Sequence, residues 1–143
     1  MNIKIIITAL FTILLIAGCA IRVKYTPSLN IDKETAKQNI KELLMLQHRD
    51  YRVSNIKINN KQLIFILNDK KNIFISFKDI WSIQFLGKRG TYIINIQDKA
   101  SRTRLVYMDI EKAKAMVNAL SVMEYNAKKM INTKTGRVKK YAY

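Results

Sequence analysis

The stretch NIFISFKDIWSIQFL, residues 72–86, carries the pattern that decides the fold. Apolar side chains occupy every second position in both of its halves: Ile73, Ile75 and Phe77, then Trp81, Ile83 and Phe85. Side chains of a strand alternate between its two faces, so this pattern predicts two half-buried strands joined by a turn at Lys78-Asp79. We expect Trp81 to pack in the core with its apolar neighbours rather than to serve as a platform for a ligand.

Similar runs flank this stretch at spacings of about ten residues, which predicts a meander of short antiparallel strands that curls or closes into a barrel. The six expected strands are Ser54–Ile58, Gln62–Asn68, Asn72–Phe77, Trp81–Leu86, Thr91–Ile96 and Arg102–Met108. Turn-forming residues separate them, such as Asn59-Asn60 and Gly87-Lys88-Arg89-Gly90. Because Gln62–Asn68 is apolar on both faces at its centre, we expect it to be covered on both sides.

Two amphipathic helices are predicted, one before and one after the strands. The first spans Asp32–His48 with Asp32 as its N-cap, and the second follows the cap Asp109 and runs to about Met130. Their expected, largely apolar stripes are Ala36, Ile40, Leu43, Leu44 and Gln47 in the first helix, and Ala113, Met116, Val117, Leu120, Met123 and Ala127 in the second. The expected fold class is therefore α+β, with an N-terminal helix and a C-terminal helix that closes the sheet.

This order of elements resembles the pleckstrin-homology-like domain over residues 51–130. Residues 74–83 (FISFKDIWSI) look like the strand, Asp-Ile turn and next strand of bacterial members, and residues 107–120 look like their entry into the closing helix. The resemblance implies a curled antiparallel sheet of six to seven strands, or a partly open barrel. The helix at 32–48 is an addition, and only six strands are counted where the family usually has seven. Such a fold implies a binding module without naming its ligand.

The N-terminus has the pattern of a secretory signal, because residues 5–17 are apolar apart from two threonines and follow Lys4. The segment Ile16-Ala17-Gly18-Cys19 resembles the lipobox of bacterial lipoproteins. The resemblance implies cleavage before Cys19 and a diacylglycerol thioether on its sulfur. With Ala20 rather than aspartate next, it also implies the outer membrane, facing the periplasm, in a cell with two membranes. The alternative is an uncleaved helix of residues 5–21, which is at the lower limit for spanning a bilayer.

The expected domain organisation follows from these segments. It comprises a signal peptide (1–18), a lipidated tether (19–31), the helix with its pleckstrin-homology-like barrel (32–130) and a basic tail (131–143).

Charge indicates the class of partner. The chain has 26 Lys+Arg and 10 Asp+Glu, and removing the signal takes away only Lys4, which leaves 25 against 10, or +15. Such an excess indicates anionic partners, and export argues against nucleic acid. The alternative is compositional drift, because 19 of the 26 basic residues are lysine. The candidate anionic-ligand surface is formed by two turns, Lys70-Lys71 and Lys88-Arg89, which would make one positive rim if they were adjacent and would otherwise be solvated turns.

No set of residues predicts catalysis, a cofactor or a metal site. His48 is the only histidine, and the carboxylates show no ligand spacing around it. The first hypothesis is therefore a non-enzymatic lipoprotein that binds a protein or peptide partner in the cell envelope. The alternative is a binder of anionic phospholipid or lipopolysaccharide headgroups, and a third hypothesis is a structural subunit of an envelope assembly.

Overall fold

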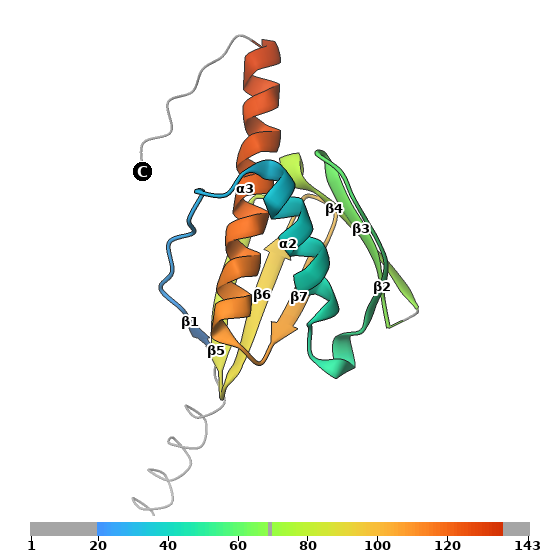
Figure 1. Ribbon diagram of the computed structural model, residues 1–143, viewed down its shortest axis with the longest axis vertical. Helices are drawn as coiled ribbons and strands as arrows, with labels where there is room; N and C mark the ends of the chain where they lie inside the picture. The colour runs from blue at the N-terminus through green and yellow to red at the C-terminus, as the bar shows by residue number, and fades with distance from the viewer. Residues whose placement is uncertain (1–19, 69, 136–143) are drawn as a thin grey trace, which may run out of the picture.

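The computed structural model describes residues 20–68 and 70–135, with side chains as far as residue 131. Its elements are β1 (Ile21–Arg22), α2 (Lys33–Met45), η1 (Arg49–Tyr51), β2 (Val53–Ile58), β3 (Gln62–Leu67), β4 (Lys71–Ser76), η2 (Phe77–Asp79), β5 (Ser82–Lys88), β6 (Thr91–Gln97), β7 (Arg102–Tyr107) and α3 (Ile110–Thr135). They form two antiparallel sheets, one ordered β1-β5-β6-β7 and the other β2-β3-β4 (Figure 1). The predicted α+β class is confirmed, and all six predicted strands are present with bounds within two residues of those expected.

The sheets do not close into a barrel, because no strand pairing between them occurs in the described parts of the chain. The reason lies in the connection between β4 and β5. There the hydroxyl of Ser76 donates to Asp79 Oδ2 at 2.8 Å, and the short helix η2 redirects the chain while Phe77 and Ile80 are buried. β5 consequently begins a second sheet instead of pairing with β4.

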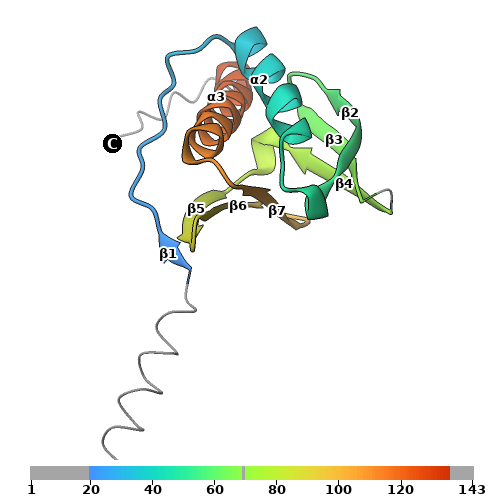
Figure 2. The ribbon, with the colours of Figure 1, turned by 60° about the horizontal axis from the view of Figure 1, so that its bottom comes forward.

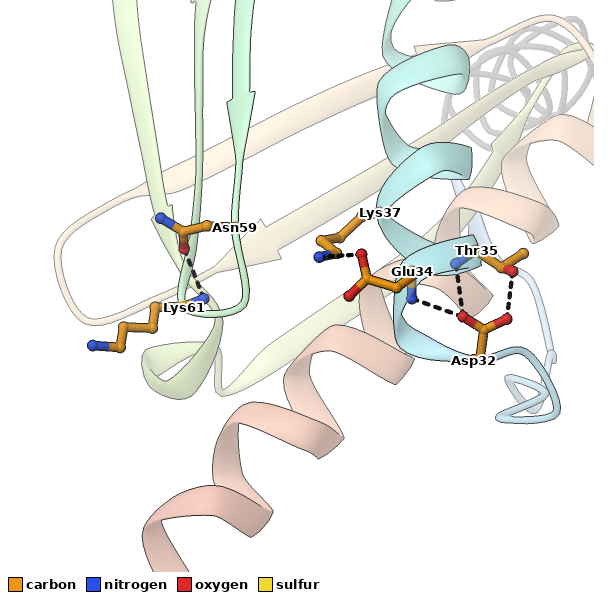
Figure 3. A network of polar contacts seen from close by, with 6 residues as sticks. All are labelled: Asp32, Glu34, Thr35, Lys37, Asn59 and Lys61. Atoms are coloured by element: carbon orange, nitrogen blue, oxygen red, sulfur yellow. Dashed lines mark hydrogen bonds and ion pairs between the residues drawn. The ribbon is translucent and has the colours of Figure 1, made fainter.

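The predicted start of α2 is confirmed. One carboxylate oxygen of Asp32 accepts the backbone N–H groups of Glu34 and Thr35 at 2.8 and 3.0 Å, as Figure 3 shows. These bonds satisfy two of the donors that a helix leaves free at its N-terminus. Figure 3 also shows the β2–β3 turn, where Asn59 Oδ1 accepts the backbone N–H of Lys61 at 2.8 Å.

α3 lies across one face of the sheet of β5, β6 and β7, with α2 beside it (Figure 2). Asp109 caps its N-terminus by accepting the backbone N–H groups of Glu111 and Lys112. Every apolar residue of both predicted stripes is buried, whereas Gln47 is half-buried, because α2 ends at Met45 and not at the predicted His48. The helix is longer than predicted, since it continues past Met130 to Thr135, so the first residues of the expected basic tail are helical. Residues 136–143 of that tail lie outside the described residues.

Residues 20–31 pack against the domain along part of their length, although they were expected to form a tether. Ile21 and Arg22 pair with the end of β5, and the N–H of Val23 donates to Phe85 O at 2.9 Å. Further on, the hydroxyl of Tyr25 donates to Asn118 Oδ1 on α3 at 2.9 Å. This segment, residues 21–28, is called the strap below.

The expectation that both faces of Gln62–Asn68 would be covered is wrong. Leu63 and Phe65 are fully buried, whereas Ile64 and Ile66 on the other face are only half-buried. The reason is that both helices lie on the inner side of the fold, so the outer face of this sheet has no covering element among the described residues.

Candidate binding surfaces

The two basic turns do not form a single rim. Lys88 and Arg89 lie at the tip of the β5–β6 hairpin beside β1, whereas Lys70 and Lys71 lie where β3 passes into β4. In both Figure 1 and Figure 2 these two places stand on different sides of the molecule. All four side chains are exposed, so each pair is a separate solvated turn.

A second kind of basic site, a shallow and open hollow, lies on β6 and β7, on the face of the sheet that points away from α3. It is a hollow of about 330 Å³ lined by Tyr51, Asn95, Arg102 and Arg104, called the arginine groove below. Asn95 and Arg104 are directly opposite each other in the β6–β7 register, and Arg102 lies two residues earlier on the same face. Asn95 is only 2% exposed, and its Oδ1 accepts a long hydrogen bond of 3.4 Å from Arg104 Nε.

The charge of the groove is uniformly positive. Among residues 20–68 and 70–131, no acidic side chain lines the groove and no ion pair to Arg102 or Arg104 occurs. A guanidinium group presents its N–H donors in a planar fork that matches a carboxylate or a phosphate. The groove is therefore suited to bind an anionic group.

The groove also lies along a sheet edge, because β7 is the last strand of its sheet. The backbone N–H of Val106 donates to Gln47 Oε1 at 3.2 Å, and its carbonyl oxygen accepts from the N–H of His48 at 3.0 Å. Alternate residues of a strand direct their backbone groups to the same edge, so those of Arg102 and Arg104 face the same way as those of Val106. Because Gln47 and His48 already occupy the edge at Val106, an extended peptide could add as a further strand only beside Arg102 and Arg104.

The prediction for Trp81 is wrong, because its side chain is 64% exposed. Strand β5 begins one residue later, and Ile80 takes the buried position instead. The indole lies against the β6–β7 turn, where its N–H donates to the carbonyl oxygen of Asp98 at 3.3 Å. Because the sheet ends next to Trp81, its indole ring lies outside the apolar core.

His48 stabilises the turn between α2 and η1. It follows the end of α2 and caps η1, with its Nδ1 3.3 Å from the backbone N of Asp50.

Across the described residues no group of three metal-ligating side chains occurs, and no helix there is long and apolar enough to cross a membrane. Cys19, the predicted lipidation site, lies outside these residues.

Sequence reasoning did not identify the arginine groove, although part of its signal was visible. Arg102 and Arg104 are two residues apart in a predicted strand, which places both on one face. Tyr51 comes from a different part of the chain, and only the folded structure brings it next to them.

Comparison with known proteins adds no identification: the chain matches no protein family, no curated protein and no solved structure.

Proposed function

We propose that this chain is a non-enzymatic binding module of the cell envelope that is anchored through a lipid on Cys19 and binds a protein or peptide partner. The observation that carries the proposal is the arginine groove, where two guanidinium groups with no acidic partner among the described residues line a hollow beside a sheet edge. Its ligand is an extended segment with an acidic side chain, because such a segment can use the edge and the guanidinium groups together.

The architecture supports a binding module of the pleckstrin-homology-like kind. A three-stranded sheet is followed by the strands β5, β6 and β7 of a second sheet and then by one C-terminal helix, α3, that packs on this second sheet. This order agrees with the resemblance in the sequence, and α2 and β1 are additions to it. Envelope location and the anchor rest on the lipobox-like segment Ile16-Ala17-Gly18-Cys19.

The test is site-specific crosslinking in cells that carry the full chain. A photoreactive residue at Tyr51 should capture an envelope protein through the groove. The double variant Arg102→Glu with Arg104→Glu should lower the yield of that product by roughly tenfold or more, because each substitution places an acid against the acidic ligand. The matched control is Lys57→Glu with Lys61→Glu, an exposed lysine of β2 and an exposed lysine of the β2–β3 turn. A product that survives the arginine variants, or is lost equally in the control, contradicts the proposal.

The alternative function, recognition of anionic phospholipid or lipopolysaccharide headgroups, is favoured by the same guanidinium groups because they bind phosphate as well as carboxylate. Vesicle binding distinguishes the two functions. If Arg102→Glu with Arg104→Glu abolishes binding to anionic vesicles, and the chain with both arginines intact captures no envelope protein through position 51, the groove is a headgroup site.

A further inference from the structure

One end of the four-stranded sheet combines exposed apolar and basic side chains. Ile21 pairs with Gly87, Lys88 pairs with Thr91, and the hydroxyl of Thr91 lies 3.7 Å from Met108 Sδ. These contacts place Ile21, Lys88 and Met108 at the same end of the four strands, with Ile21 on the sheet face that carries Gly87 and Tyr107, and with Lys88 and Met108 on the opposite face. Ile21 is 74% exposed and Met108 is 60% exposed, so two large apolar side chains face the solvent at this end.

The charged groups around these apolar side chains are mostly basic. The exposed basic residues at this end are Arg22, Lys88, Arg89 and Lys112, and the exposed acidic residues are Asp109 and Glu111. Asp109 is occupied as the cap of α3, and Glu111 pairs with Lys114 at 2.8 Å. Arg89 adopts a φ of 47°, a left-handed conformation that favours glycine or asparagine, in the tight turn with Gly90. An arginine is thus held at the hairpin tip in a conformation that does not favour it.

Cys19 comes just before β1 in the sequence, and β1 belongs to this same end of the sheet. Ala20 is the only residue between Cys19 and β1. Two residues span at most about 7 Å even when fully extended. The strap then fixes the following residues, since the backbone N–H of Ser28 donates to Asn118 Oδ1 at 2.8 Å on α3. A lipid on Cys19 would therefore hold this end of the domain at the bilayer surface, with no flexible segment to lift it away.

We propose that this end of the domain, formed by Ile21, Arg22, Lys88, Arg89 and Met108, is a membrane-docking surface that rests on anionic phospholipid headgroups; this rests on the lipid anchor of the proposed function. The exposed apolar side chains enter the interfacial region, and the basic side chains approach the lipid phosphates, which attract them electrostatically. The groove lies farther along the same sheet and stays accessible to its partner. Docking would therefore fix the orientation in which the groove is presented.

Quenching of tryptophan fluorescence by brominated phospholipids tests the contact, because bromine quenches only indoles that lie close to it. The full chain is first isolated from membranes, mass spectrometry establishes the lipid on Cys19, and the protein is reconstituted into vesicles of phosphatidylglycerol and phosphatidylethanolamine. The native indole, Trp81, lies at the other end of β5, seven residues from Lys88 and therefore about 23 Å away, and should keep its emission. The indole introduced by Met108→Trp in a Trp81→Phe background should lose emission, and Ile21→Trp in the same background is the second variant.

Equal quenching of the native indole and both introduced indoles, or no quenching of either introduced one, overturns the proposal. The charge contribution is tested with Lys88→Glu, which should reduce quenching at position 108, and with Lys57→Glu, which should not. Raising NaCl from about 0.1 M to about 1 M, which shortens the Debye length from about 10 Å to about 3 Å, should reduce quenching in the same way. Quenching that is insensitive to both changes overturns the role of the anionic headgroups.

Failure of the anchor is separable from failure of the docking surface. If Cys19 carries no lipid, the proposed anchor is wrong. The same protein added to preformed vesicles then tests the docking surface by itself. Quenching of the introduced indoles supports the docking surface, and absence of quenching overturns it. Partner capture through Tyr51 is measured in a separate experiment, so the groove can fail while the docking surface stands.

Discussion

A single buried hydroxyl connects the sheet to the end of helix α2. Tyr107 is fully buried in β7, and its Oη donates to the carbonyl oxygen of Leu43 at 3.1 Å. Burial raises the pKa of this phenol above its ordinary value, because the interior disfavours the phenolate. The hydroxyl therefore stays a donor at any pH at which the domain is used. Leu43 O also accepts the N–H of Leu46 at 3.1 Å, so it would keep one partner if the hydroxyl were removed.

Tyr107→Phe should lower the free energy of unfolding by about 1 kcal/mol, which is the net contribution of one hydrogen bond whose acceptor retains a second donor. Urea unfolding followed by circular dichroism measures the change. Tyr92→Phe is the matched control, because Tyr92 lies directly opposite Tyr107 in the β6–β7 register and is only half-buried. The control should change stability by less than half as much. An equal loss in both variants would mean that the bond to Leu43 contributes nothing of its own.

The strap is held to the domain at the level of elements, by one short strand pairing and one side chain of α3. Asn118 Oδ1 accepts both the hydroxyl of Tyr25 at 2.9 Å and the backbone N–H of Ser28 at 2.8 Å. The ring of Tyr25 also packs edge-on against Phe85, with centroids 6.0 Å apart, and Lys114 Nζ lies 5.9 Å from its centroid. A two-residue strand alone adds little, so Asn118 is the main polar attachment of this segment.

Asn118→Ala should release the strap without unfolding the domain. The backbone amides of Val23 and Ser28 should exchange with solvent faster, by roughly tenfold, because local opening would lose about 1.4 kcal/mol of hydrogen bonding. Amide hydrogen exchange measures this, and exchange in the buried strand β6 should be unchanged. Asn126→Ala is the control on the same helix, since the Asn126 side chain bonds only Val122 O of its own helix. Faster exchange throughout the domain would show that Asn118 supports the core instead.

The elements that sequence reasoning identified are those whose signal is local. Strand alternation, the turn at Asn59 and the caps Asp32 and Asp109 each depend on residues within a few positions of one another. The missed features depend on distant contacts. β1 is too short to show a period and exists because β5 provides its partner. Trp81 is exposed because β5 begins one residue after it and Ile80, the residue before it, is buried in its place. The groove needed Tyr51 to meet a strand about fifty residues later.

At the scale of the whole molecule, the two ends differ in what they can contact. β1 and the β5–β6 hairpin lie at one end of the long axis, and the last turns of α3 lie at the other, as Figure 1 shows. The helix has 26 residues and is therefore about 39 Å long. A domain that docks through Ile21 and Met108 stands upright on the bilayer and holds the C-terminal turns of α3 far from it. The arginine groove lies between the docking end and the C-terminal turns of α3. A partner that is itself bound to the membrane could therefore reach it.

An upright orientation predicts different distances from the bilayer for labels at the two ends. Nitroxides attached through Lys88→Cys and Met130→Cys, with Cys19 blocked by its lipid, should respond differently to a nickel-chelating lipid in the vesicles. The first should relax strongly, whereas the second, about 30 Å along α3 from Ile110, should relax little. Equal relaxation at both positions would mean that the domain lies on its side. Adding Asn118→Ala should reduce the difference, because a released strap lets the domain tumble on residues 20–31, and orientation then no longer follows from the fold.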